Sequence, residues 1–192
     1  MAFPKGYEWL GKIGTLPRTI SEAFKEYGTL ETPGVADNPV ILGWAKEVGL
    51  ERFYSDDSIP WCGLFVAVIA KRSGKAGVEA PLWARNWSTF GLEVAQNVGS
   101  TTAPKLKFAG RKASLGDVLV FVRNGGGHVA FYLGETPSHY LCLGGNQSDK
   151  VCIAAIPKTR CIAVRRPTYN NQPASVKPYH LGGVEVREGS EA

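Results

Sequence analysis

The 192-residue sequence contains no apolar run of the roughly 18 residues that a membrane-spanning helix requires. Its N-terminus, MAFPKGYEWLGKIGTLPRTI, also lacks the continuous apolar core and the small-residue cleavage site of a secretory signal peptide. We therefore expect synthesis in the cytosol and no stable insertion into a membrane. The composition excludes a disordered or fibrous chain, because 44% of the residues are hydrophobic and 20% are charged, as in ordinary globular proteins.

Cysteine is scarce in this chain. The four cysteines fit neither a dense disulfide framework nor the CxxC spacing of a zinc site, and no cluster of ligand-type residues has metal-site spacing. We therefore expect no metal and no cofactor. A Cys142–Cys152 bridge between neighbouring strands is conceivable, but a reducing compartment favours apolar packing for these two residues and for Cys161. Only Cys62 then needs an explanation of its own.

The excess of positive charge is small. A formal net charge of +5 and an isoelectric point near 9.0 favour polyanionic surroundings such as nucleic acid, anionic lipid or cell-wall polymer. Lysine and arginine are scattered in short pairs with no nucleic-acid motif around them, and solvated faces are their usual position. We expect no nucleic-acid partner.

Short helices are predicted in the first half of the chain. Proline and glycine at its two ends mark a helix over residues 17–28, and a turn region followed by a glycine stop marks another over 39–48. A third helix is predicted over 60–73, capped by Ser58 or Asp57. A further helical segment lies within APLWARNWSTFG, and a loop rich in small polar residues follows from 99 to 110.

The pattern changes to strands after Gly116. Five segments rich in β-branched or aromatic residues, each bounded by turn residues, predict an antiparallel meander. They cover residues 117–122, 128–134, 139–145, 150–156 and 160–166. Helices followed by a sheet indicate an α+β fold. We expect one domain over residues 1–167 and an irregular tail over 168–192, which is polar and rich in Pro and Gly.

Cys62 occupies the first turn of the predicted helix 60–73, within the stretch IPWCGLFVAVIAKRSG. Apolar residues point from this helix in several directions, so we expect protein around most of it. The unpaired N–H groups of a helix start lower the pKa of a thiol, and a nearby histidine lowers it further. Cys62 is therefore a candidate nucleophile, although a free cysteine is more often a small buried hydrophobe.

His128 is the candidate base. Three glycines precede it at the start of a predicted strand, which gives an uncrowded approach to another element. If a hairpin turns near Thr136, antiparallel register places His128 opposite Gly145 and sets Asn146 beside the imidazole. Asn146 could then fix the orientation of the ring, with Gln147 and Asp149 as weaker candidates for that position, whereas a Gly/Asn-rich turn is the ordinary use of such a stretch.

The succession PWCGLFV, NWSTFG, GDVLVFV…GHVAFYLG and LGGNQSD resembles the cysteine amidases and peptidases of the CHAP and NlpC-like superfamily, in particular a group of phage and prophage lysins. The resemblance covers most of residues 20–167. It implies a papain-like α+β fold, with the nucleophile on a central buried helix packed on an antiparallel sheet of about five strands. It also implies that Cys62, His128 and Asn146 act as nucleophile, general base and orienting residue. The chain departs from many CHAP enzymes in having glycines where a glutamate precedes the asparagine.

Other residues are candidates for binding the oxyanion or the substrate. The backbone N–H of Cys62 points out of a helix start and is the natural oxyanion donor. Asp56 and Asp57 could bind a cationic part of a wall peptide, with helix capping as an equal or better explanation. Three tryptophans could form a wall for sugar or peptide, although burial in the core is the more frequent position for each. These tryptophans are Trp61, Trp83 and Trp87, and Gln147 is a further candidate for substrate binding.

These observations and the resemblance predict a peptidoglycan hydrolase, either an N-acetylmuramoyl-L-alanine amidase or an endopeptidase, which forms a thioester acyl-enzyme on Cys62. Its partner would be the stem peptide of bacterial peptidoglycan, and we expect a monomer. A phage or prophage endolysin would collect in the host cytoplasm and act in the periplasm or wall after release. The alternatives are an inactive wall-binding module on the same fold, an acyl transferase, and an antibacterial amidase toxin.

Overall fold

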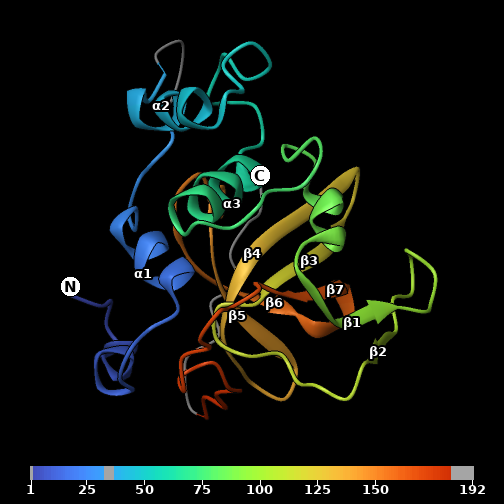
Figure 1. The fold of residues 1–192 in the computed structure, drawn as a ribbon. Helices are drawn as coiled ribbons and strands as arrows, with labels where there is room; N and C mark the ends of the chain where they lie inside the picture. The colour runs from blue at the N-terminus through green and yellow to red at the C-terminus, as the bar shows by residue number, and fades with distance from the viewer. Residues whose placement is uncertain (1, 33–36, 183–192) are drawn as a thin grey trace.

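The computed structural model describes residues 2–32 and 37–182 (Figure 1). The helical elements are η1 (Glu8–Lys12), α1 (Arg18–Lys25), α2 (Pro39–Val48), α3 (Cys62–Arg72), η2 (Ala84–Thr89) and η3 (Lys158–Arg160). The strands are β1 (Leu92–Asn97), β2 (Leu106–Phe108), β3 (Val118–Arg123), β4 (Gly126–Glu135), β5 (His139–Gly144), β6 (Cys152–Pro157) and β7 (Cys161–Arg166). Among the described residues, no helix is both long and apolar enough to cross a bilayer.

The ends of α2 follow from local chemistry. The side chain of Asn38 accepts a hydrogen bond from the N–H of Val40, Pro39 occupies the first turn, and Gly49 ends the helix in a left-handed conformation. The helix predicted over 39–48 is therefore confirmed. The prediction that Ser58 or Asp57 caps the next helix is wrong, because α3 begins only at Cys62, after Trp61, without a side-chain cap.

The predicted papain-like arrangement with a sheet of about five strands is wrong. The seven strands form one antiparallel sheet in the order β2-β1-β7-β3-β4-β5-β6. Strand β1 was not predicted, and β2 lies within the loop expected over 99–110. The meander also ends at β6, because β7 crosses back to pair between β1 and β3.

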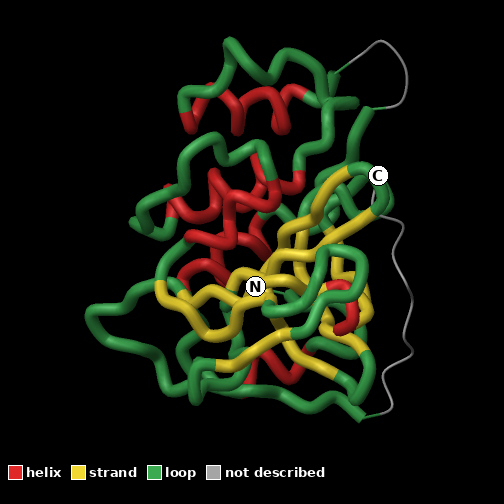
Figure 2. The backbone as a smooth tube through the Cα atoms, turned by 90° about the vertical axis from the view of Figure 1, so that its right-hand side faces the viewer, coloured by secondary structure: helices red, strands yellow, loops and turns green. Residues whose placement is uncertain are grey.

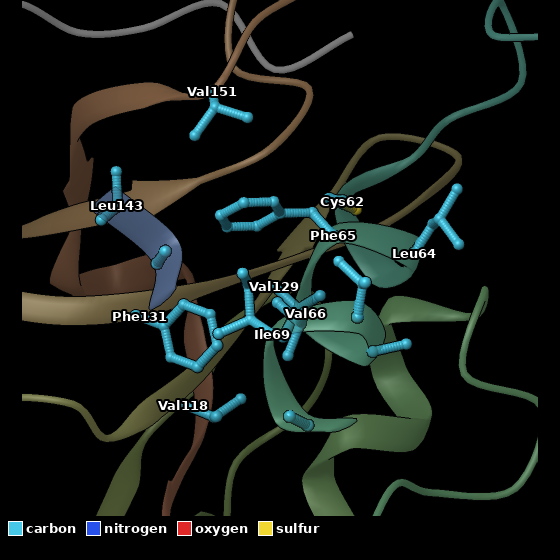
Figure 3. Close-up of a cluster of buried hydrophobic side chains, with 14 of the residues drawn as sticks. Cys62, Leu64, Phe65, Val66, Ile69, Val118, Val129, Phe131, Leu143 and Val151 are labelled. Atoms are coloured by element: carbon cyan, nitrogen blue, oxygen red, sulfur yellow. The ribbon is translucent and has the colours of Figure 1, made fainter. Parts of the chain in front are cut away.

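Helix α3 is surrounded by protein, as its apolar sequence predicts. Every residue from Cys62 to Ala70 is buried, and the helix packs between α2 and the inner face of the sheet (Figures 2 and 3). Figure 3 shows Phe65 and Ile69 of α3 beside Val129 and Phe131 of β4. Such a helix has little freedom to move, because close-packed interiors resist displacement.

Gly63 allows a loop to approach α3 very closely. A Cβ atom at this position would lie 2.3 Å from the carbonyl oxygen of Pro81 and 2.7 Å from that of Leu82. Only glycine fits beside this backbone. The loop before η2 is therefore fixed against the start of α3, one residue after Cys62.

A second apolar cluster fills the other face of the sheet. It runs across the sheet from Val94 of β1 to Tyr140 of β5 and Ile156 of β6. Cys142 and Cys161 lie in this cluster, and neither they nor Cys152 forms a disulfide. The conceivable Cys142–Cys152 bridge is absent, because Cys142 pairs with Ala154 in the register of β5 and β6.

The segment after β7 lies on the body of the protein. Between 168 and 182 it contains no helix or regular strand, in agreement with the expected irregular tail. Its backbone nevertheless contacts the end of β4, where the N–H of Glu135 donates to Tyr179 O at 2.8 Å and the N–H of Leu181 donates to Glu135 O at 2.9 Å. The rest of the predicted tail, 183–192, is outside the described residues.

Candidate active site

Cys62 and His128 lie together, as the sequence predicts. Cys62 is the first residue of α3 and His128 lies near the start of β4, with 5% and 2% of their surfaces exposed. The imidazole is hydrogen-bonded to the Cys62 thiol, and the backbone N–H of Val129 also bonds to that sulfur. The helix start and the strand start thus meet at one sulfur atom.

The surroundings of Cys62 favour the thiolate. Burial raises the pKa of the thiol, but the hydrogen bond and charge of His128, the N–H of Val129 and the charge of Arg123 together bring the pKa below its ordinary value. Cys161 and Cys152 differ from Cys62, because burial raises the pKa of Cys161 to about 12 and also raises that of Cys152. Cys62 is the thiol whose surroundings prepare it for attack.

Gln147, rather than Asn146, orients the histidine. Its Oε1 lies 3.0 Å from Nε2 of His128, which leaves Nδ1 as the ring nitrogen for Cys62. The amide nitrogen of Gln147 donates to the carbonyl oxygens of Cys152 at 2.6 Å and Cys142 at 3.3 Å. The amide is therefore held so that its oxygen faces the imidazole, and Nε2 carries the proton.

The predicted orienting role of Asn146 is wrong. Asn146 is 3% exposed and adopts a left-handed conformation with φ of 56°, and its Oδ1 has no hydrogen-bond partner among the described residues. The predicted register was extended too far along the chain. Strand β5 ends at Gly144, and Asn146 lies in the turn beyond it with a left-handed backbone, so the antiparallel pairing does not set the direction of its side chain.

The two glycines before Asn146 make this geometry possible. A Cβ on Gly144 would lie 2.7 Å from Oε1 of Gln147, and a Cβ on Gly145 would lie 2.6 Å from atoms of Trp61 and Phe65. The first glycine makes room for the Gln147 amide, and the second lets this turn pack against α3. These contacts explain why glycine stands at both positions.

The tryptophans divide into two groups. Trp61 and Trp87 are 0% exposed and lie in the core, so they cannot form the predicted substrate wall. Their ring nitrogens donate within the protein, Trp61 Nε1 to Glu31 at 3.1 Å and Trp87 Nε1 to the Pro81 carbonyl at 2.9 Å. Trp83 differs, because it is 73% exposed and follows the loop held against Gly63. It alone remains a candidate wall.

The aspartates before α3 mainly hold loops together. Asp57 is 2% exposed and its Oδ2 accepts the backbone N–H groups of Thr32 and Asn38, so it cannot bind substrate as predicted. Asp56 is exposed and accepts the N–H of Ser58 within its own turn. Carboxylate oxygens of Asp37, Asp56 and Asp57 lie within 4.8 Å of one another, and Asp37 Oδ1 accepts the N–H of Asp57. These hydrogen bonds link the segment around Asp57 to the segment around Asp37, which accounts for the cluster of carboxylates.

Sequence reasoning placed Gln147 among the substrate-binding candidates and gave it only a weaker claim to the orienting position. The side chain is 0% exposed and its polar atoms are engaged within the protein, so it cannot bind substrate directly. The roles of the Val129 N–H and of Arg123 were missed altogether, since a backbone donor has no sequence signature. No known family model, curated protein or solved structure matches the chain, so the argument for its function depends on this geometry.

Proposed function

We propose that the protein is a cysteine hydrolase that cleaves an amide bond of bacterial peptidoglycan. The observation that carries the proposal is the relay from Gln147 through His128 to Cys62, with the sulfur at the start of a fixed helix. A nucleophile, a base within hydrogen-bond reach and a third group that orients the base are the parts that acyl transfer requires.

The chemistry proceeds in two halves. The Cys62 thiolate attacks the carbonyl carbon of the amide, and the backbone N–H of Cys62 stabilises the negative oxygen that forms. The protonated imidazole of His128 donates its proton to the leaving amine, which departs as the thioester forms. A water molecule, deprotonated by His128, then attacks the thioester, releases the carboxylic acid and restores the thiol. Gln147 keeps the ring in one orientation throughout.

The substrate class is supported by the motif resemblance and by charge. The excess of positive charge suits a wall that carries many carboxylates and phosphates. As an endolysin, the protein would collect in the host cytoplasm and act on the stem peptide in the periplasm or wall after release.

Digestion of purified peptidoglycan tests the proposal. The wild-type protein should reduce the turbidity of a wall suspension and release new amino groups, whereas Cys62→Ala should do neither. Mass spectrometry of the products then assigns the bond, either between muramic acid and alanine or within the peptide. Equal digestion by Cys62→Ala would refute the proposal, and circular dichroism of the variant would show that its fold is intact.

A further inference from the structure

Arg85 lies beside the candidate active site and has no role in the relay. It belongs to η2, directly after the exposed Trp83 and the buried Ala84. A Cβ on Gly127 would lie 3.0 Å from Cγ of Arg85, so the arginine stem crosses the strand at the residue before His128. Gly127 lacks a side chain at the place where Arg85 needs the space.

The stem of Arg85 lies on the same face of the sheet as α3. Side chains alternate along a strand, so Gly127 faces the side that Val129 faces, and Val129 packs with Phe65 in the cluster around α3. Two residues of β4 span about 7 Å, and the N–H of Val129 bonds to the Cys62 sulfur. The stem of Arg85 is therefore about two extended residues from the N–H that bonds to the sulfur, and its guanidinium, held at Gly126, is about three.

The guanidinium of Arg85 is held at one edge and open at the other. Its Nε and Nη2 donate to the carbonyl oxygen of Gly126 at 3.2 and 2.7 Å. A guanidinium has five N–H donors, and no carboxylate partner of Arg85 occurs in residues 2–32 and 37–182. The residue is exposed, so the remaining donors can meet a ligand. An arginine already fixed by one carbonyl loses less rotational freedom when it binds an anion.

We propose that Arg85 forms a carboxylate-binding subsite near Cys62, which selects substrates with an acidic group about two to three residues from the cleaved amide. This inference rests on the proposed function and names one feature of its substrate. Arg123 contributes differently, because it ends β3 opposite Gly126 and its charge acts on Cys62 itself. Arg85 discriminates between ligands, whereas Arg123 affects the thiolate whatever the ligand.

Two alkylating reagents of matched length test the subsite without any wall substrate. N-iodoacetyl-glycyl-glycine carries a carboxylate two residues from the reacting carbon, its C-terminal amide does not, and the Cys62 thiolate displaces iodide from either reagent. The ratio of their rate constants at Cys62, measured by mass spectrometry at one pH, reports the attraction for a carboxylate at that distance. We expect Arg85→Gln to lower the acid-to-amide ratio by at least about threefold and to change the rate with the amide by less than about twofold.

The controls separate position from charge. Arg111→Gln removes an exposed arginine whose recorded contact is a 3.4 Å bond to Glu93 O, and it should leave the ratio unchanged. Arg85→Lys keeps the charge but loses the planar pair of bonds to Gly126, so the ratio should lie between those of Arg85→Gln and the wild-type protein. An unchanged ratio in Arg85→Gln, or an equal fall in Arg111→Gln, would overturn the subsite.

A second measurement uses the proposed activity. Synthetic stem peptides with a free or an amidated carboxylate should differ in KM with the wild-type protein, and Arg85→Gln should raise KM for the free acid alone. A protein that shows the alkylation ratio but cleaves no peptide would retain the subsite and lose the proposed function. Equal KM effects on both peptides would contradict the assignment of Arg85 to the carboxylate.

Discussion

The Oε1 atom of Gln147 lies 3.0 Å from Nε2 of His128, and both side chains are buried. A buried amide at this distance fixes the tautomer of the ring as well as its direction, because its oxygen can only accept. The other ring nitrogen, Nδ1, is thereby turned toward the thiol of Cys62. The proposed catalysis thus depends on a residue that never meets the substrate.

Gln147→Ala should lower kcat of wall-peptide cleavage by roughly 10- to 100-fold and leave KM nearly unchanged, because the imidazole loses its orientation and the substrate loses no contact. Initial rates over a range of peptide concentrations measure both constants. The matched control is Asn146→Gly, which keeps the left-handed backbone of the neighbouring residue and removes its side chain. A larger loss in the Asn146 variant would return the orienting role to Asn146.

Alkylation of Cys62 should persist below the pH at which an ordinary thiol stops reacting. The pKa of Cys62 is lowered, so thiolate is present above that lowered value and disappears only as the pH falls through it. His128→Gln should move the midpoint of the rate–pH profile upward, because the main stabilising partner is lost. Cys161, with its pKa raised to about 12, serves as an internal reference and should stay unmodified near neutral pH. Identical profiles for wild type and variant would contradict the pairing.

Gly63→Ala should destabilise the protein by about 1–3 kcal/mol, because the new methyl group meets two backbone carbonyls that cannot move independently. Urea unfolding followed by tryptophan fluorescence measures the change in free energy. Gly43→Ala in α2 is the control, since nothing lies within 4 Å of its added Cβ, and it should be neutral or stabilising by up to about 1 kcal/mol. Equal changes in unfolding free energy for Gly63→Ala and Gly43→Ala would show that the close approach of the loop does not determine the cost of a side chain at Gly63.

Asp117→Ala should cost about 3–5 kcal/mol of unfolding free energy. Asp117 is 0% exposed and accepts two bonds from Arg166, at 2.8 and 2.9 Å, so its removal leaves a guanidinium without its charge partner. Denaturant titration at neutral pH gives the value. The comparison is Glu93→Ala, which breaks a 3.4 Å pair with Arg165 at the surface and should cost no more than about 1 kcal/mol. A cost for Asp117→Ala as small as that of the surface pair would contradict the argument.

Features set by local chemistry were predictable from the sequence. Helix α2 illustrates this, because Asn38, Pro39 and Gly49 define its ends without help from the rest of the fold. Local chemistry also marked Cys62 and His128 as candidates one by one, at a buried helix start and at a glycine-flanked strand start. That they meet across the fold was implied by the motif resemblance and not by local pattern.

Features set by pairing between distant segments were not predictable. Strand β1 reads LEVAQN, which alternates weakly, and it is fixed by β7 more than sixty residues later. Its omission, together with that of β2, is why the expected sheet had two strands too few. The assignment of Asn146 failed because it extended the strand register past Gly144, where β5 ends and the chain turns with a positive φ at Asn146.

The amide of Gln147 is tied to the carbonyl oxygens of Cys142 in β5 and Cys152 in β6, and β6 is the outermost strand on its side of the sheet. Fraying begins at sheet margins, where strands have a neighbour on one side only. On gentle heating, the turnover of such an enzyme should therefore decline before its core melts. Local unfolding at the edge of the sheet would then abolish activity reversibly, while the rest of the protein stays folded and regains activity on cooling.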